Sequence, residues 1–147
     1  MIFSPDMLIK VLDGSKTQTR RRVKDRDWIR WVKGSTEIVA HHHFKSPIGY
    51  SEDHGYDISG VNRAGRALWT VCNTYAVCPG RGQKAVARIR ILDIRAQSPS
   101  LISDDDARAE GFDSREAFWG KLRALYGVDV DLDALYWALT FELVKGD

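Results

Sequence analysis

The stretch DGSKTQTRRR brings together the side chains best suited to chemistry in this chain. Lys16 stands three residues before Thr19, and Arg20, Arg21 and Arg22 follow at once. A threonine hydroxyl becomes a nucleophile when a base lies within hydrogen-bond reach, and a lysine can be that base if burial or nearby cations lower its pKa. The arginines would lower the pKa of Lys16 by like-charge repulsion. The same spacing also fits a solvated basic strand, which is the commoner outcome for a charge run.

Other kinds of chemistry find little support in the sequence. It holds no nucleotide-binding glycine motif, serine elbow or zinc signature. Cys72 and Cys78 lie six residues apart in a stretch that reads as extended, which predicts about 20 Å between them and therefore reduced, structural thiols. The triplet at residues 41–43 is all histidine, but adjacent residues on a strand point to opposite faces. We therefore expect no metal site and no cofactor.

The bulk composition describes one soluble domain. The chain has 147 residues, of which 44% are hydrophobic and 29% charged, so residues 1–147 suit a single domain with its own core. No apolar run approaches the roughly 18 residues needed to cross a bilayer, and the N-terminus does not read as a signal peptide. A cytoplasmic location without a membrane partner is expected.

Charge is unevenly distributed although the net charge is only +2. Residues 16–26 are mostly basic, and residues 104–116 are mostly acidic. A local basic stripe can hold a phosphate or a nucleic-acid backbone without a strongly basic chain. The charge pattern therefore leaves open an RNA-binding role.

The first third of the chain predicts one helix, one strand and a long excursion. Ser4 can cap a helix in which Pro5 takes the first position and Gly14 the left-handed position after its end. Residues 17–23 then alternate in a way that starts a strand. Residues 28–62 read as an insertion or long excursion, with a strand near residues 37–44.

The remainder predicts strands with two late helices. Residues 67–77 and 84–94 are two long strand candidates, and residues 135–144 alternate as a last strand. Ser103 and Asp106 form a capping box for a short helix that Gly111 ends, and Ser114 can cap another helix. The predicted fold class is therefore α+β, with a small mixed sheet or barrel flanked by helices.

The order of these blocks resembles the ASCH domain family. The blocks are GSKTQTRR after a short amphipathic helix, GRALW, KAVARIRI, ISDDDARAEGF, and a closing WALTFEL strand, and they cover most of the chain outside residues 24–62. The resemblance implies a fold similar to the PUA domain: a small, mostly antiparallel β-barrel with helices beside it. It also implies a cleft that accommodates RNA or a nucleoside.

Some small bacterial members of that family are amidohydrolases that remove the acyl group from N(4)-acetylcytidine. Their lysine and threonine in the block Gly-x-Lys-Thr-x-Thr match Lys16 and Thr19 of this chain, and their glutamate matches Glu110. The resemblance thus implies Thr19 as nucleophile, Lys16 as its base, and Glu110 as a group that holds or donates a proton. Two further pairs complete the expected site: Arg20 or Arg21 would stabilise an oxyanion or anchor the nucleoside, and Tyr75 and Trp137 would stack on the base.

The chain departs from the family pattern in one block. Longer members read Gly-Asp-x-Leu-Trp-Val-Arg-Glu, whereas residues 65–72 here end in Thr70, Val71 and Cys72, so the pocket floor should be less polar. The alternative function is an RNA-binding module or a single-strand ribonuclease that uses the basic cleft of the same fold. The acyl group, and the choice between a free nucleoside and an RNA-borne base, stay open, while DNA is not an expected partner. A third option, a protein-interaction domain, lacks an exposed apolar stripe in the sequence.

Overall fold

The computed structural model describes residues 1–23, 27–31, 38–42 and 66–145, with side chains described outside residues 27–31, 38–42, 66 and 67. The elements in chain order are α1 (Pro5–Asp13), β1 (Gln18–Arg22), β2 (Asp27–Trp31), β3 (Ile38–His42), β4 (Arg66–Thr70), β5 (Thr74–Val77), β6 (Ala87–Gln97), α2 (Asp104–Ala109), α3 (Arg115–Tyr126) and β7 (Tyr136–Val144). A single 3-10 turn at Pro99–Leu101 links β6 to α2.

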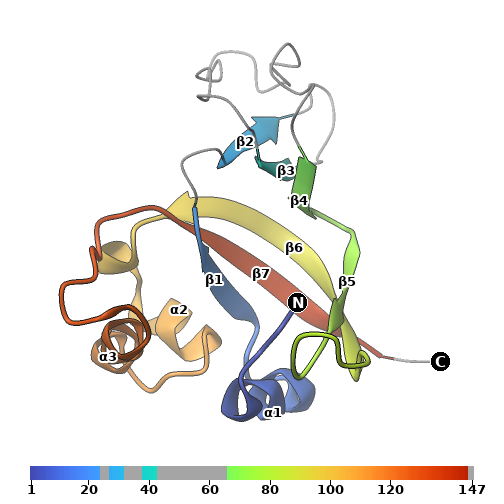
Figure 1. Ribbon diagram of the computed structural model, residues 1–147, viewed down its shortest axis with the longest axis horizontal. Coiled ribbons are helices and arrows are strands. Elements are labelled where there is room, and N and C mark those ends of the chain that lie inside the picture. Colours follow the sequence, from blue (N-terminus) through green and yellow to red (C-terminus); the bar gives the residue numbers. More distant parts are fainter. Residues whose placement is uncertain (24–26, 32–37, 43–65, 146–147) are drawn as a thin grey trace.

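The main sheet is a curled antiparallel half-barrel in the order β1-β7-β6-β5. Figure 1 shows the long strands β6 and β7 crossing the molecule, with α1 on one side and the second sheet, β2-β3-β4, on the other. The helices α2 and α3 lie together beside β1. This arrangement confirms the predicted α+β class and its antiparallel strands flanked by helices.

Helix α1 begins and ends where the sequence predicts. Pro5 occupies its first turn, and Gly14 has a φ of 84°, the left-handed conformation that glycine adopts without strain. The predicted cap is wrong in one respect, because the Ser4 hydroxyl hydrogen-bonds the Asp6 carboxylate instead of capping the helix backbone. Met7 and Val11 are the buried residues of the helix.

Strand β7 is buried on both faces, so its side chains belong to two hydrophobic clusters, one on each side of the sheet. Trp137, Leu139 and Phe141 pack in the core that contains α1. Tyr136, which lies on the other face, packs with residues of α2 and α3. The alternation of the last strand predicted the first face only, since a residue such as Tyr136 has a polar tip and is less often fully buried.

The prediction of one strand over residues 67–77 is wrong, because the chain turns between β4 and β5. Cys72 has a φ of 71°, its N–H donates to the Ile91 carbonyl, and the Asn73 N–H donates to the Thr70 carbonyl. Strand hydrogen bonding therefore stops for three residues. Both cysteines, Cys72 and Cys78, are free thiols.

The predicted excursion over residues 28–62 is only partly described. The expected strand near residues 37–44 is present as β3, which pairs with β2 and with β4. Residues 32–37 and 43–65 lie outside the described residues, as do the side chains of His41 and His42 and the whole of His43. None of the helices within the described parts has the length and apolar character to cross a bilayer.

Candidate active site

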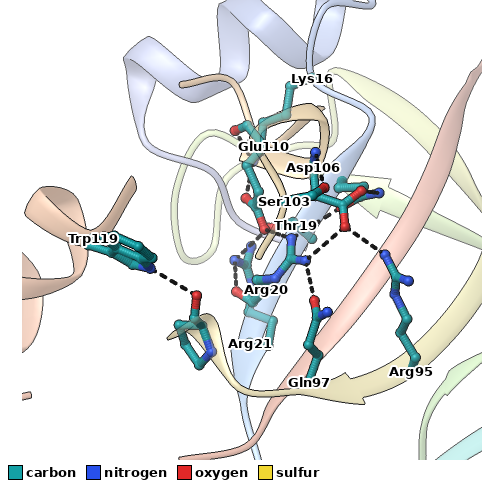
Figure 2. Close-up of polar contacts among 12 residues, drawn as sticks. Lys16, Thr19, Arg20, Arg21, Arg95, Gln97, Ser103, Asp106, Glu110 and Trp119 are labelled. Carbon is teal, nitrogen blue, oxygen red and sulfur yellow. Dashed lines mark hydrogen bonds and ion pairs between the residues drawn. The ribbon is translucent and has the colours of Figure 1, made fainter. Parts of the chain in front are cut away.

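A buried ion pair joins Lys16, just before β1, to Glu110, just after α2. The Lys16 ammonium donates to Glu110 twice, to the carboxylate Oε2 at 2.8 Å and to the main-chain carbonyl at 2.6 Å. Each residue is only 3% exposed to solvent. Because 94 residues separate them in sequence, this contact depends on the packing of α2 against β1 (Figure 2).

Local backbone features hold both partners in place. Lys16 follows the left-handed Gly14, and its N–H donates to the Lys10 carbonyl at 2.9 Å, which folds the chain back on α1. The Thr17 N–H donates to the Ala109 carbonyl at 2.8 Å, next to Glu110. Gly111 then turns the chain away with a φ of 98°. These main-chain contacts therefore hold the backbones of Lys16 and Glu110 next to each other.

Arg20 is the second cation on the Glu110 carboxylate. Its Nη1 donates to Glu110 Oε1 and to Gln18 Oε1, both at 3.1 Å, and its Nη2 donates to Gln97 Oε1 at 2.9 Å. Asp106, one helical turn before Glu110, accepts from Gln18 Nε2 at 2.9 Å and pairs with Arg95 at 2.9 Å. Figure 2 shows these groups converging from β1, β6 and α2. Glu110 thus has a cation on each carboxylate oxygen.

Thr19 lies on the opposite face of β1 from Arg20. Thr19 pairs across the sheet with Leu139, which belongs to the core that contains α1, and Thr19 is 2% exposed. Arg21 lies on the same face and its Nη1 donates to Thr19 Oγ1 at 2.9 Å and to the Arg20 carbonyl at 3.1 Å. The second nitrogen, Nη2, donates to the Ile2 carbonyl at 3.0 Å. Arg21 therefore places a positive charge directly on the Thr19 hydroxyl.

A cavity of about 270 Å³ brings these side chains together at the edge of β1. Residues of both β1 faces line it, with α1 and its N-terminal segment on one side and α3 on the other. The lining residues are Ile2, Phe3, Ser4, Met7, Lys16, Thr19, Arg20, Arg21, Glu110, Phe112, Phe118, Lys121, Leu122, Leu125, Tyr126 and Tyr136. A largely apolar wall with a few convergent polar groups is the usual composition of a small-molecule site.

Burial changes the acid–base properties of the cavity cations. The pKa of Lys16 is lowered from its ordinary value, chiefly by burial, while the Glu110 carboxylate opposes that shift. Burial also lowers the pKa of Arg21. Four cationic side chains line the cavity, namely Lys16, Arg20, Arg21 and Lys121, against the single carboxylate of Glu110. The lysine is therefore easier to deprotonate than one in water.

The structure brings five of the predicted site residues to one cavity. Lys16, Thr19, Arg20, Arg21 and Glu110 all line it. Within the described part of the chain, however, the hydrogen bonds of the Lys16 ammonium go to Glu110 and the Thr19 hydroxyl is bonded by Arg21.

The two residues expected to stack on a base lie elsewhere. The Tyr75 hydroxyl accepts a hydrogen bond from the Thr70 N–H, and its ring packs edge-on against Trp69 with the centroids 5.6 Å apart. Trp137 is buried in the α1 core. The aromatic rings that do line the cavity belong to Phe3, Phe112, Phe118, Tyr126 and Tyr136.

Sequence reasoning named Arg20 as an anchor for substrate but not as a partner of Glu110, and it missed Gln18 and Asp106 beside them. Gln18 and Arg20 lie two apart on one face of a strand, and Asp106 and Glu110 lie four apart on one side of a helix turn. Those two spacings together could have predicted that the strand and helix face each other. Among the described residues, no group of three or more His, Cys, Asp and Glu side chains could hold a metal ion.

Comparison with known proteins gives structural likenesses only. No protein-family model and no curated protein matches the chain. The structure is similar to the crystal structure of an Enterococcus faecalis protein of the family model DUF984, with a TM-score of 0.53 and 17% sequence identity over 97% of this chain and 78% of that one. A solved ASCH domain from Lactobacillus crispatus also matches, with a TM-score of 0.49 and 14% identity over 93% of this chain and 69% of that one. At these identities the likeness shows the fold, and it leaves the reaction to be argued from the site.

Proposed function

We propose that the protein is an amidohydrolase that removes the acyl group from N(4)-acylated cytidine. One observation carries the proposal: Lys16, Thr19 and Glu110 are all buried and line one cavity, with Lys16 Nζ 2.8 Å from Glu110 Oε2. A hydroxyl, an amine and a carboxyl group in one cavity are the nucleophile, base and acid that amide hydrolysis needs. The resemblance of the sequence blocks to acylcytidine hydrolases supplies the substrate class.

The reaction begins with a proton transfer inside the ion pair. Lys16 gives a proton to Glu110 along their hydrogen bond, which leaves a neutral amine and a carboxylic acid in the cavity. Burial lowers the pKa of Lys16 and so favours its neutral form. The neutral amine then takes the proton of Thr19, whose Oγ1 forms a bond to the acyl carbon.

Collapse of the tetrahedral intermediate releases cytidine. The bond between the acyl carbon and N4 breaks, and N4 takes the proton that Glu110 holds. The acyl group remains as an ester on Thr19, with Lys16 charged and Glu110 ionised again. A second proton transfer from Lys16 to Glu110 restores the base, which takes a proton from water. The resulting hydroxide attacks the ester, Thr19 Oγ1 leaves with the proton from Glu110, and the carboxylic acid is released.

Arg21 and Arg20 have different tasks in this scheme. Arg21 already donates to Thr19 Oγ1 at 2.9 Å, so its charge stabilises the developing alkoxide and the oxyanion that follows. Arg20 holds Glu110 Oε1 while Lys16 holds Oε2, and it therefore positions the carboxylate. Only Arg21 of the two is assigned a contact with reacting atoms.

The size of the cavity favours a small ligand over a strand of RNA. Its volume of about 270 Å³ lies just below the roughly 300–1,000 Å³ usual for small-molecule pockets. A nucleoside or its acylated base suits that volume. The salt dependence of binding distinguishes this function from the alternative, an RNA-binding module.

The proposal is tested by incubating the purified protein with a panel of N(4)-acylated cytidines and measuring cytidine and free acid. Thr19→Ala and Lys16→Met should each reduce release of cytidine by at least about 1,000-fold, since nucleophile and base act as a unit. Thr17→Ala is the matched control, because Thr17 belongs to the same sequence block but is exposed and does not line the cavity. Turnover like that of the wild type in either Thr19→Ala or Lys16→Met would exclude this mechanism.

A further inference from the structure

The Tyr136 hydroxyl is a buried hydrogen-bond donor without a partner among the residues that the structure describes. Tyr136 begins β7, is 2% exposed and lines the cavity. Its hydroxyl is buried, yet it makes no hydrogen bond within the described residues. Burial raises the pKa of Tyr136, so the group stays protonated and able to donate. A buried polar group without a partner costs stability, so it calls for an explanation, and a ligand that meets it is one.

A second donor of this kind belongs to the same wall. The Nε–H of Arg20 is also buried without a hydrogen-bond partner in the described parts, whereas Nη1 donates two hydrogen bonds and Nη2 donates one. The strand register pairs Arg22 with Tyr136 and Arg20 with Ala138, so Tyr136 and Arg20 lie diagonally on one face of the sheet. Among the described residues, the cavity lining therefore carries two buried donors without a protein acceptor.

We infer that Tyr136 recognises the ring of the substrate by donating to an acceptor remote from the acylated amine, with Arg20 Nε donating to the neighbouring acceptor. The inference rests on the proposed function for the identity of the ring. An acylated cytosine offers two adjacent acceptors, the 2-carbonyl oxygen and N3, and two protein donors are the matching set. A ring with donors at those two positions would leave the Tyr136 hydroxyl, the Arg20 Nε–H and both ring donors without acceptors.

Thr19 and Tyr136 lie on opposite faces of the sheet, and both line the cavity at the edge of β1. Tyr136 pairs with Arg22, three residues along β1 from Thr19, which corresponds to about 10 Å along the strand. A substrate that meets both residues must therefore reach past the edge of β1, with its amide toward Thr19 and its ring toward Tyr136. In cytosine the 2-carbonyl oxygen, N3 and N4 lie in that order along one edge of the ring, so this edge would face the protein.

Rings that line the cavity complete the recognition surface. Phe118 and Tyr126 of α3 lie on the same wall as Tyr136, and Arg20 lies over the Phe118 ring at 5.8 Å from its centroid. An apolar surround strengthens a hydrogen bond by excluding water, so one hydroxyl can have a measurable effect on binding.

The experiment compares the wild type with Tyr136→Phe on two substrates, N(4)-acetylcytidine and an analogue that lacks the 2-carbonyl. In Tyr136→Phe, the KM for N(4)-acetylcytidine should rise roughly 5- to 20-fold with kcat within about 2-fold, which is the signature of lost ground-state binding. The wild type should lose a similar factor on the analogue, and the variant should lose little more. The melting temperature of Tyr136→Phe should stay unchanged or rise, because the change removes an unsatisfied buried hydroxyl.

Equilibrium binding of cytidine, measured by titration calorimetry, separates this inference from the proposed function because it needs no turnover. If the wild type hydrolyses the substrate and Tyr136→Phe has the same KM and binds cytidine equally well, the inference is wrong and the function stands. If no acylcytidine is hydrolysed but cytidine binds and Tyr136→Phe weakens it, the function is wrong and the inference stands. A fall in melting temperature with unchanged binding assigns Tyr136 a structural role and overturns the inference.

Discussion

At the scale of single residues, Lys16 couples stability to pH. Its ammonium is buried with the Glu110 carboxylate beside it and Arg20 and Arg21 nearby, and burial lowers its pKa from the ordinary value of 10.5. Between the lowered pKa and 10.5 the unfolded chain binds more protons than the folded chain, so the free energy of unfolding rises with pH in that window. Removing the amine removes this contribution.

Lys16→Met should therefore show its greatest stability relative to the wild type near neutral pH. The difference should shift in favour of the wild type between neutral pH and about pH 10.5, because the wild type loses the buried Lys16 charge as the pH rises through the lowered pKa. Urea denaturation at the two pH values measures the shift. Lys84→Met, at an exposed lysine, is the control. If the free energy of unfolding of Lys16→Met and of Lys84→Met depends on pH in the same way, the titration of Lys16 does not contribute to stability.

The prediction of individual site residues depended more on the resemblance to the ASCH family than the prediction of helices and strands did. Lys16 and Thr19 stand in one short block, so their types and spacing suggested chemistry directly. Glu110 lies 94 residues from Lys16, and a helix-terminal glutamate is usually exposed. Only the order of the family blocks indicated it. Tyr136 was missed because its role depends on which face of β7 meets α3, and that is settled by packing.

At the scale of elements, the turn after α2 controls where Glu110 lies. Gly111 has a φ of 98°, and a Cβ added there would lie 3.0 Å from Lys10 Cδ and 3.3 Å from Met7 Sδ. Lys10 cannot move away freely, because its ammonium donates to the Gly111 carbonyl. Both the backbone conformation and the contact with α1 therefore require glycine at this position.

Gly111→Ala should lose more stability than Gly14→Ala. The two glycines share a left-handed conformation, which costs a residue with a side chain about 1–2 kcal/mol, but nothing lies within 4 Å of a Cβ at Gly14. The additional loss in Gly111→Ala measures the contact of α2 with α1, and cytidine release should fall as Glu110 shifts. Urea denaturation and turnover of both variants test this. Equal losses of stability with normal turnover in Gly111→Ala would contradict it.

The elements themselves were largely predictable, and the failures have physical causes. Pro5 and Gly14 fix the ends of α1 by their backbone preferences, and the Ser103 and Ser114 hydroxyls accept from the N–H groups that caps satisfy. The turn at Cys72 could not be predicted, because a positive φ at cysteine is locally unfavourable. It is fixed by a distant hydrogen bond, from the Cys72 N–H to the Ile91 carbonyl of β6.

At the scale of the whole molecule, the cavity forms where four parts of the chain meet. The N-terminal segment with α1 and β1 supplies Lys16 and Thr19, the end of α2 supplies Glu110, the start of β7 supplies Tyr136, and α3 supplies one wall. The predicted strands and helices indicated the α+β class and the block order implied a PUA-like fold with a cleft, yet no single block shows which residues line it. Its walls belong to both faces of β1, and a strand pattern does not show which elements cover each face.

The charge of the assembled cavity provides the test between a nucleoside and RNA. Hydrolysis of the uncharged N(4)-acetylcytidine should change less than about 2-fold between 50 and 200 mM salt, because the catalytic charges are buried and salt screens them weakly. Binding of a single-stranded RNA through three phosphate contacts would instead weaken by about 20-fold over the same range, from a slope of roughly −0.7 per contact. Turnover of the nucleoside and fluorescence binding of a short RNA are measured at both salt concentrations. Steeply salt-dependent RNA binding without any hydrolysis would identify the cavity as part of an RNA-binding surface. Hydrolysis that is insensitive to salt supports the nucleoside as substrate, since then neither recognition by Tyr136 nor attack by Thr19 depends on a phosphate.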